Sequence, residues 1–201
     1  MNNPPPIKPS VLFLPLALSL GMLLALWVTW HHSRPLRPSA PSFVELNRTN
    51  LMRLQNHWCV LGQTNPFTGV MLEFYPGGAR MSRSVISNGL LNGLSEGWFT
   101  NGQIQIQETY HDNLSDGLRT KWYPNGKKLS ESAIVQGKLE GIFRHWHIDG
   151  SLAEEIPMHA GRQEGVGHAY YPSGYLAEEV EVRAGQVIHK ATFKPGERKG
   201  L

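Results

Sequence analysis

Apolar and polar residues alternate in short runs along the C-terminal two thirds of the chain. Each run carries an aromatic residue at one position and an aliphatic residue four positions earlier. The aromatic residues are Phe74, Trp98, Trp122, Trp146 and Tyr170, and the aliphatic residues are Val70, Leu94, Leu118, Ile142 and Val166. Residues four apart in a strand point to the same face. The pattern therefore predicts β-strands with one apolar and one polar face.

Glycines mark the ends of these strands with a period of 24 residues. Three positions recur: Gly69, Gly93, Gly117, Gly141 and Gly165; Gly78, Gly102, Gly126, Gly150 and Gly174; and Gly89, Asn113, Gly137, Gly161 and Gly185. A period of this length is typical of a repeat protein, in which each unit is too small to bury its own apolar face.

The second glycine position follows Tyr-Pro-x or a similar triplet, as in Tyr123-Pro124-Asn125-Gly126. This composition predicts a type I turn followed by a left-handed glycine. The return strands add Ile86, Tyr110, Ile134, Met158 and Val182, which we assign to the apolar face. We predict an all-β fold: an antiparallel β-meander of five 24-residue hairpin repeats at 69–190, with ten strands in a single-layer curved sheet.

The best copy of the repeat, residues 117–131, resembles the MORN-variant repeat of the YwqK-like antitoxin family. Residues 65–69, preceded by His57-Trp58 and Gly62, are similar to the half-repeat that opens many members, and we place an opening half-repeat at 43–68. The resemblance covers about residues 54–190. It implies a role as a protein-binding scaffold, a membrane-adjacent module or an antitoxin.

The N-terminal segment 11–30 contains no charged side chain. Twenty apolar residues span a bilayer as a helix, so we predict a single-pass transmembrane anchor, with a cleaved signal peptide as the alternative. Residues 1–10 form the tail before it, 31–42 a Pro/Ser-rich tether after it, and 191–201 a basic C-terminal tail. The charges that flank this segment do not determine on which side of the membrane the repeats lie.

Charge and cysteine content narrow the function classes. The formal net charge is +3 and the basic residues are scattered, whereas nucleic-acid binding needs a concentrated basic stripe. We therefore expect no nucleic-acid partner. Cys59 is the single cysteine, and its apolar neighbours indicate a buried hydrophobe.

Candidate chemistry is sparse. The sequence has no nucleophile elbow, phosphate-binding loop or zincin motif, so we expect no enzyme, no catalytic residue and no cofactor. Glu131, Glu155 and Glu179 share one repeat position, which indicates a structural role. A weak metal site is conceivable at His145 and His147, with His168 as third ligand. His147, however, stands where the other copies have Tyr or Phe.

A second row of aromatic residues follows the first and is expected on the opposite face. We predict that this row binds a protein partner together with variable polar residues: Tyr75, Phe99, Tyr123, Tyr171, Arg119, Lys121 and Arg144. The hypothesis is a membrane-tethered, non-enzymatic module that binds a protein, which the family resemblance implies to be a toxin. The alternatives are a lipid-surface or envelope module and a metal-binding or enzymatic protein centred on the histidines. The oligomeric state stays open.

Overall fold

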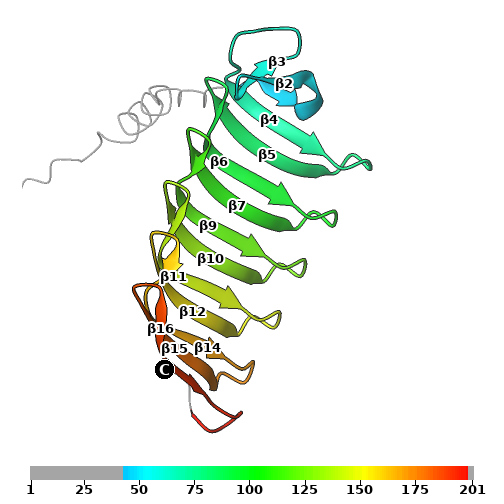
Figure 1. Cartoon of the computed structure of the whole chain (residues 1–201). Helices are drawn as coiled ribbons and strands as arrows, with labels where there is room; N and C mark the ends of the chain where they lie inside the picture. Colours follow the sequence, from blue (N-terminus) through cyan, green and yellow to red (C-terminus); the bar gives the residue numbers. More distant parts are fainter. Residues whose placement is uncertain (1–42, 199–201) are drawn as a thin grey trace, which may run out of the picture. The chain divides into compact units, whose positions relative to one another are not determined.

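The computed structural model describes residues 43–198, which form a long sheet of stacked hairpins (Figure 1). Within this range the sheet has 14 strands in the order β1-β4-β5-β6-β7-β9-β10-β11-β12-β14-β15-β16, with β8 paired to β7 and β13 to β12. A separate hairpin, β2 and β3, forms a two-stranded sheet. Nearly every strand therefore pairs with its neighbours in sequence, as expected for a stack of repeats.

The strand bounds follow the repeat. The strands are β1 (Glu45–Asn47), β2 (Leu51–Leu54), β3 (His57–Val60), β4 (Gly69–Phe74), β5 (Arg80–Ser87), β6 (Leu90–Trp98), β7 (Ile104–His111), β8 (Leu114–Ser115), β9 (Gly117–Trp122), β10 (Lys128–Val135), β11 (Lys138–Trp146), β12 (Leu152–His159), β13 (Arg162–Gln163), β14 (Gly165–Tyr170), β15 (Leu176–Arg183) and β16 (Gln186–Thr192), with a 3-10 turn η1 (Arg48–Asn50).

The all-β hairpin stack agrees with the prediction, but the fold class as stated is wrong in its details. The sheet is mixed because β1 pairs with β4 in parallel. It has more strands than the ten predicted because β1 and β16 extend the sheet and because two strands are interrupted, giving β8 with β9 and β13 with β14.

The transmembrane part of the fold and localisation predictions is also not supported. Among residues 43–198 no helix is long and apolar enough to cross a membrane. The predicted anchor at 11–30 itself lies outside the described residues, and we draw nothing further from it.

Two kinds of turn close the hairpins. At Tyr123-Pro124-Asn125-Gly126 the Gly126 amide donates to the Tyr123 carbonyl, and Gly126 has a φ of 81°. This is the predicted type I turn with a left-handed glycine. At the opposite ends two consecutive residues have positive φ, as in Ala160 (50°) and Gly161 (84°). These are type I′ turns. The glycine pattern predicted a positive φ at the second of the two residues and not at the first.

The first glycine position bends the strand. Gly93, Gly117 and Gly165 have φ values of 112°, 119° and 103°, and the pairing register shifts beside Gly93, between Ser84 and Ile86. The residues before each glycine then fold back over one face of the sheet, as shown by Ser115, whose hydroxyl donates to Glu108. We call the face toward which the strands bend the inner face and the other the outer face.

The prediction of a single apolar face is wrong because of the pairing register. Ile86 pairs with Gly69 and so lies on the inner face, while Val70, next to Gly69, lies on the outer face. The inner positions Ile86, Ile134 and Val182 are buried. On the outer face, the predicted core residues Leu94, Leu118, Ile142 and Val166 are 39–55% exposed.

The N-terminal hairpin β2–β3 covers the inner face at the first repeat. Leu51, Trp58 and Phe67 form a core cluster with Met71 and Ile86 from the sheet. Cys59 is also buried here, in agreement with its apolar surroundings in the sequence. The first repeat thus gains a cover that the later repeats replace by their own folded-back segments.

The type I′ turns generate a stability prediction. Ala160 holds a left-handed conformation that costs an L-residue about 1–2 kcal/mol, so Ala160→Gly should stabilise the protein by about 0.5–1 kcal/mol after the entropy cost of glycine. The same substitution at Ala169, in strand β14, should destabilise it by a similar amount. Urea unfolding followed by circular dichroism measures both. A loss of stability in both variants would contradict the turn assignment.

Candidate functional site

The predicted partner-binding tyrosines connect neighbouring hairpins. The hydroxyl of Tyr75 donates to the backbone carbonyl of Trp98 at 2.7 Å, and that of Tyr123 to the carbonyl of Trp146 at 2.8 Å. Tyr171 makes the same contact with Phe193 at 2.9 Å. All three tyrosines are half-buried. Each side chain therefore lies along the sheet and joins its own turn to the next repeat.

The two other members of this row show what the contact requires. His147 keeps it, since its Nε2 lies 2.8 Å from the carbonyl of Tyr170. Phe99 has no polar atom with which to reach the carbonyl of Trp122. The histidine thus substitutes for tyrosine as an inter-repeat hydrogen-bonding group. The predicted role of this row in partner binding stays a prediction.

The polar residues of the predicted site do not gather in one place. Arg119 and Lys121 lie on the inner face, because Arg119 pairs with Ser132 and Lys121 with Ser130. Arg144 lies on the outer face, where its Nε donates to Glu155 at 2.7 Å. The sheet thus separates Arg144 from the other two.

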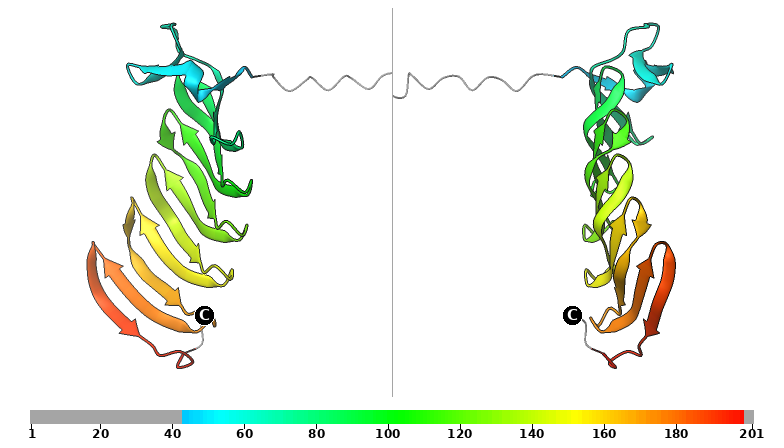
Figure 2. Two further views of the ribbon diagram at one scale, coloured as in Figure 1. Left: turned by 90° about the vertical axis from the view of Figure 1, so that its right-hand side faces the viewer. Right: turned by 60° about the vertical axis from the view of Figure 1, so that its left-hand side comes forward.

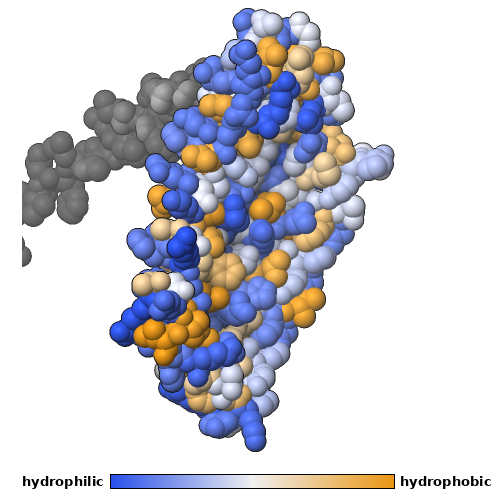
Figure 3. Space-filling model, viewed as in Figure 1, coloured by the Kyte–Doolittle hydropathy of each residue, from blue (hydrophilic) through white to orange (hydrophobic). Residues whose placement is uncertain are grey.

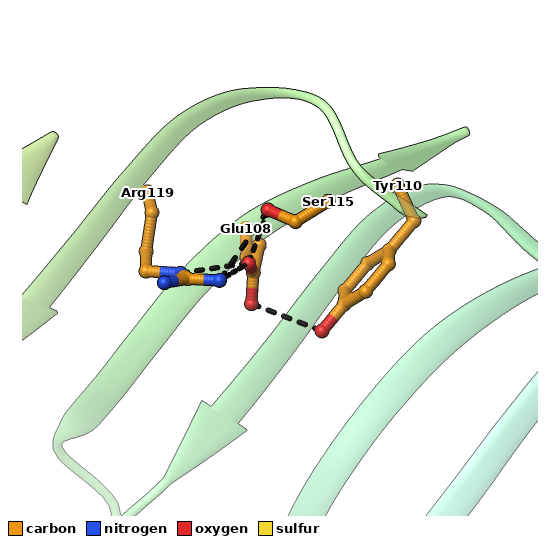
Figure 4. Close-up of polar contacts among 4 residues, drawn as sticks. All are labelled: Glu108, Tyr110, Ser115 and Arg119. Atoms are coloured by element: carbon orange, nitrogen blue, oxygen red, sulfur yellow. Dashed lines mark hydrogen bonds and ion pairs between the residues drawn. The ribbon is translucent and has the colours of Figure 1, made fainter. Parts of the chain in front are cut away.

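Arg119 belongs to a buried polar cluster with Glu108, Ser115 and Tyr110 (Figure 4). Glu108 is 5% exposed and accepts hydrogen bonds from Arg119 Nε at 2.7 Å, from Tyr110 at 3.0 Å and from Ser115. Burial by itself raises the pKa of the Glu108 carboxyl, but the bonds from Arg119 and Ser115 and the guanidinium charge outweigh it, so the pKa lies below its ordinary value. Burial and the carboxylate raise the pKa of Tyr110.

The cluster joins two hairpins, since Glu108 lies on β7 and Arg119 on β9. The equivalents of Glu108 in neighbouring repeats, Ser84 and Ser132, are buried and small. Glu108 is thus a local replacement, and its carboxylate is fully engaged by donors. It has the character of a structural ion pair and not of a general base.

The three histidines considered as metal ligands are kept apart. His145 pairs with Glu154 on the inner face, and His168 pairs with Glu155 and Glu179 on the outer face. No group of three or more His, Cys, Asp or Glu side chains in the described part of the chain could hold a metal ion. His145 and His147 do not share a strand face as predicted, because β11 ends at Trp146 and His147 lies in the following turn, with its Nε2 2.8 Å from the Tyr170 carbonyl.

The inner face is hollowed along the stack, with hydrophilic and hydrophobic residues interspersed (Figure 3). One hollow, of about 110 Å³, lies over Gly167 and Ala169 between Glu154 and Glu178. Glu178 is engaged by Lys190 at 2.9 Å. This volume suits one side chain at most, well below the size of a usual small-molecule site.

The outer face carries three columns that run across the strands. The aliphatic column is Leu94, Leu118, Ile142 and Val166. The charged column is Arg83, Glu96, Gln107, Thr120, Glu131, Arg144, Glu155, His168 and Glu179, each residue paired with the next. The aromatic column is Phe74, Trp98, Trp122, Trp146 and Tyr170. Directly paired residues share a face, so the charged column is continuous.

The aliphatic column alternates large and small residues. Leu118 pairs with Ala133, Ile142 with Pro157 and Leu94 with Thr109. The large members are 39–55% exposed. In the aromatic column, Arg80 lies 5.6 Å from the Trp98 ring and Lys128 lies 5.5 Å from the Trp146 ring. Cations therefore cover part of the aromatic surface, and the aliphatic column stays open to solvent.

A comparison with protein-family models gives a match to the MORN repeat variant at residues 91–112 and 115–132. These segments comprise β6 to β10, the middle of the stack. The chain carries MORN-variant repeats. No curated protein matches the sequence closely enough to count as a relative. The more specific resemblance to the YwqK-like antitoxins therefore stays a resemblance.

The tyrosine contacts of the MORN-variant repeats yield a matched pair of predictions. Tyr123→Phe removes one hydrogen bond and should destabilise the protein by about 1 kcal/mol. Phe99→Tyr should supply a hydroxyl donor for the backbone carbonyl of Trp122 and stabilise the protein by about 0.5–1 kcal/mol. Chemical denaturation of both variants tests this. A destabilising Phe99→Tyr would show that the turn at Phe99 differs from the other hairpin tips.

The buried cluster makes stability depend on pH. Because the folded-state pKa of Glu108 is below its unfolded value, its contribution is present above the unfolded pKa and is lost as pH falls through the folded pKa. Arg119→Met should cost about 3 kcal/mol at neutral pH, since it leaves a buried carboxylate without its partner. The difference from wild type should shrink in acid. A cost that is constant across a pH series of unfolding midpoints would refute this account.

Proposed function

We propose that the MORN-variant sheet is a non-enzymatic scaffold that binds a protein on its outer face. The observation that carries this proposal is the aliphatic column, which stays exposed over four successive repeats. A long apolar stripe bordered by polar residues is the usual mark of a protein interaction surface. The neighbouring charged column would fix the orientation of the bound partner, because a wrong orientation would bring like charges together.

The energy available is sufficient for recognition. Full burial of a Leu, Ile or Val side chain contributes about 1.5–3 kcal/mol, so covering four that are roughly half exposed contributes about 4 kcal/mol. The charged and aromatic columns lie beside the aliphatic column and add to the area that a partner can cover. A partner that covers all three columns would also bury the Trp rings, which frequently dominate binding energy.

The polar groups of the sheet support a non-enzymatic role. The most deeply buried carboxylate, Glu108, is saturated by Arg119, Ser115 and Tyr110. The turn residues Tyr123 and His147 bind backbone carbonyls. These side chains stabilise the stack and leave recognition to the outer face. The resemblance to antitoxins makes a toxin the first class of foreign partner to look for.

Site-specific photo-cross-linking in the cells that produce the protein tests this proposal. A photoreactive residue in place of Leu118 or Ile142 should give the same protein adduct, identified by mass spectrometry. The matched control replaces Ile148, which is 63% exposed at a hairpin tip outside the columns. No adduct at Leu118 and Ile142, or an equal yield at Ile148, would refute binding on the outer face.

A further inference from the structure

We infer that the occupant of the outer face is a second copy of this chain, stacked face to face about a two-fold axis that runs along the strands between β10 and β11. The inference rests on the proposed function, since it names the partner of the same surface. It follows from the order of large, small and charged residues within the columns.

The choice of axis follows from charge. A two-fold axis along the stack would place each member of the charged column over itself, so that Glu131 would oppose Glu131 of the second copy. It would also place aliphatic residues over aromatic ones. An axis along the strands keeps each column over the same column and reverses the order of the repeats. Only the second arrangement brings unlike residues together.

The position of the axis follows from size. With the axis between β10 and β11, Ile142 faces Ala133 of the second copy and Leu118 faces Pro157. Val166 likewise faces Thr109. The residues that pair with Leu94, Leu118 and Ile142 are small (Thr109, Ala133 and Pro157), and neighbouring strands are about 4.8 Å apart. Val166 pairs with Glu181, so at the margin Leu94 faces Glu181 of the second copy. Large residues of each copy then enter the gaps between large residues of the other, as in two packed sheets.

The same axis places opposite charges together at its centre. Glu131 and Arg144 pair directly across β10 and β11. In the stacked pair, Glu131 faces Arg144 of the second copy and Arg144 faces Glu131. Four charges of alternating sign therefore surround the axis. In the aromatic column, Lys128 faces Trp146 of the second copy, the pair of residue types already in contact within one chain.

The pairing is less favourable at the margin. Glu96 faces Glu179 of the second copy, where the two carboxylates would repel. Each has a local donor, Gln107 at 2.9 Å from Glu96 and His168 at 3.3 Å from Glu179. These contacts lie at the rim, where solvent screens charge.

The area is that of a stable dimer. Nine strands, β5 to β15 along the sheet path, span about 43 Å, and the three columns with their side chains are about 18 Å wide. Roughly 800 Å² per copy is covered, which matches the standard size of a specific interface. Figure 2 shows similar strand directions from β4 to β12, whereas the last strands, β14 to β16, turn away from this direction, so the closest contact is expected around the axis.

A charge exchange at the axis tests the inference by analytical ultracentrifugation of the purified full chain. The wild-type chain should sediment as a dimer at micromolar concentration. Arg144→Glu places four carboxylates around the axis and should weaken the dimer at least tenfold, as should Glu131→Arg with four guanidinium groups. The double exchange restores alternating charges and should return the dissociation constant to near the wild-type value.

Lys190→Glu is the matched control, because Lys190 pairs with Val180 on the inner face and the same charge change there should leave the dimer intact. Circular dichroism of each variant reports whether the sheet is folded. A monomeric wild-type chain, or a double exchange no tighter than the single variants, would overturn the inference. If the chain is monomeric and Leu118 and Ile142 cross-link to a different protein, the proposed function stands and only the second copy is excluded.

Discussion

A sheet without a covering layer has to hold its hairpins together through contacts within the sheet. In the described chain this constraint is met by backbone pairing and by side chains that reach one repeat ahead. Tyr75, Tyr123 and Tyr171 each donate to a carbonyl of the next hairpin, and His147 makes the same contact with an imidazole. The stack is therefore a series of nearest-neighbour joints, with stability distributed along its length.

These contacts leave the two faces with different tasks. On the inner face, strands bent at glycines such as Gly117 and Gly165 cover Ile134 and Val182. On the outer face the middle of the stack has no such cover, and Leu94, Leu118, Ile142 and Val166 remain exposed, whereas Val70 and Tyr170 near its ends are buried. A molecule built in this way keeps its core on one side and a regular, solvent-facing array on the other, which suits recognition of an equally regular surface.

The sequence predicts the turns well because glycine spacing reflects backbone geometry directly. Gly126 has the left-handed conformation expected of it. The faces were mispredicted because Ile86, Ile134 and Val182 pair with the glycines that precede the aliphatic residues, and not with the aliphatic residues themselves. Neighbouring residues of a strand point to opposite faces, and the composition of the sequence does not reveal which residues pair across two strands.

The candidate site was partly within reach of the sequence. The columns follow from the period once the register is known, since Arg144 and Glu155 are paired residues of one hairpin. The hydroxyl contacts could not be predicted, because an aromatic row looks the same whether it faces a partner or a neighbouring carbonyl. Glu108 and Arg119 were missed because their meeting depends on the turn at Asp112 and Asn113, where both residues have positive φ.

One joint of the stack differs from the rest in kind. Between the second and third hairpins, Phe99 cannot make the hydroxyl contact, and the buried pair of Glu108 and Arg119 bridges the same two hairpins. At this joint an ion pair thus takes the place of a neutral hydrogen bond that does not depend on pH. Protonation of Glu108 in acid would weaken this joint, whereas the joints made by the tyrosine hydroxyls would be unaffected.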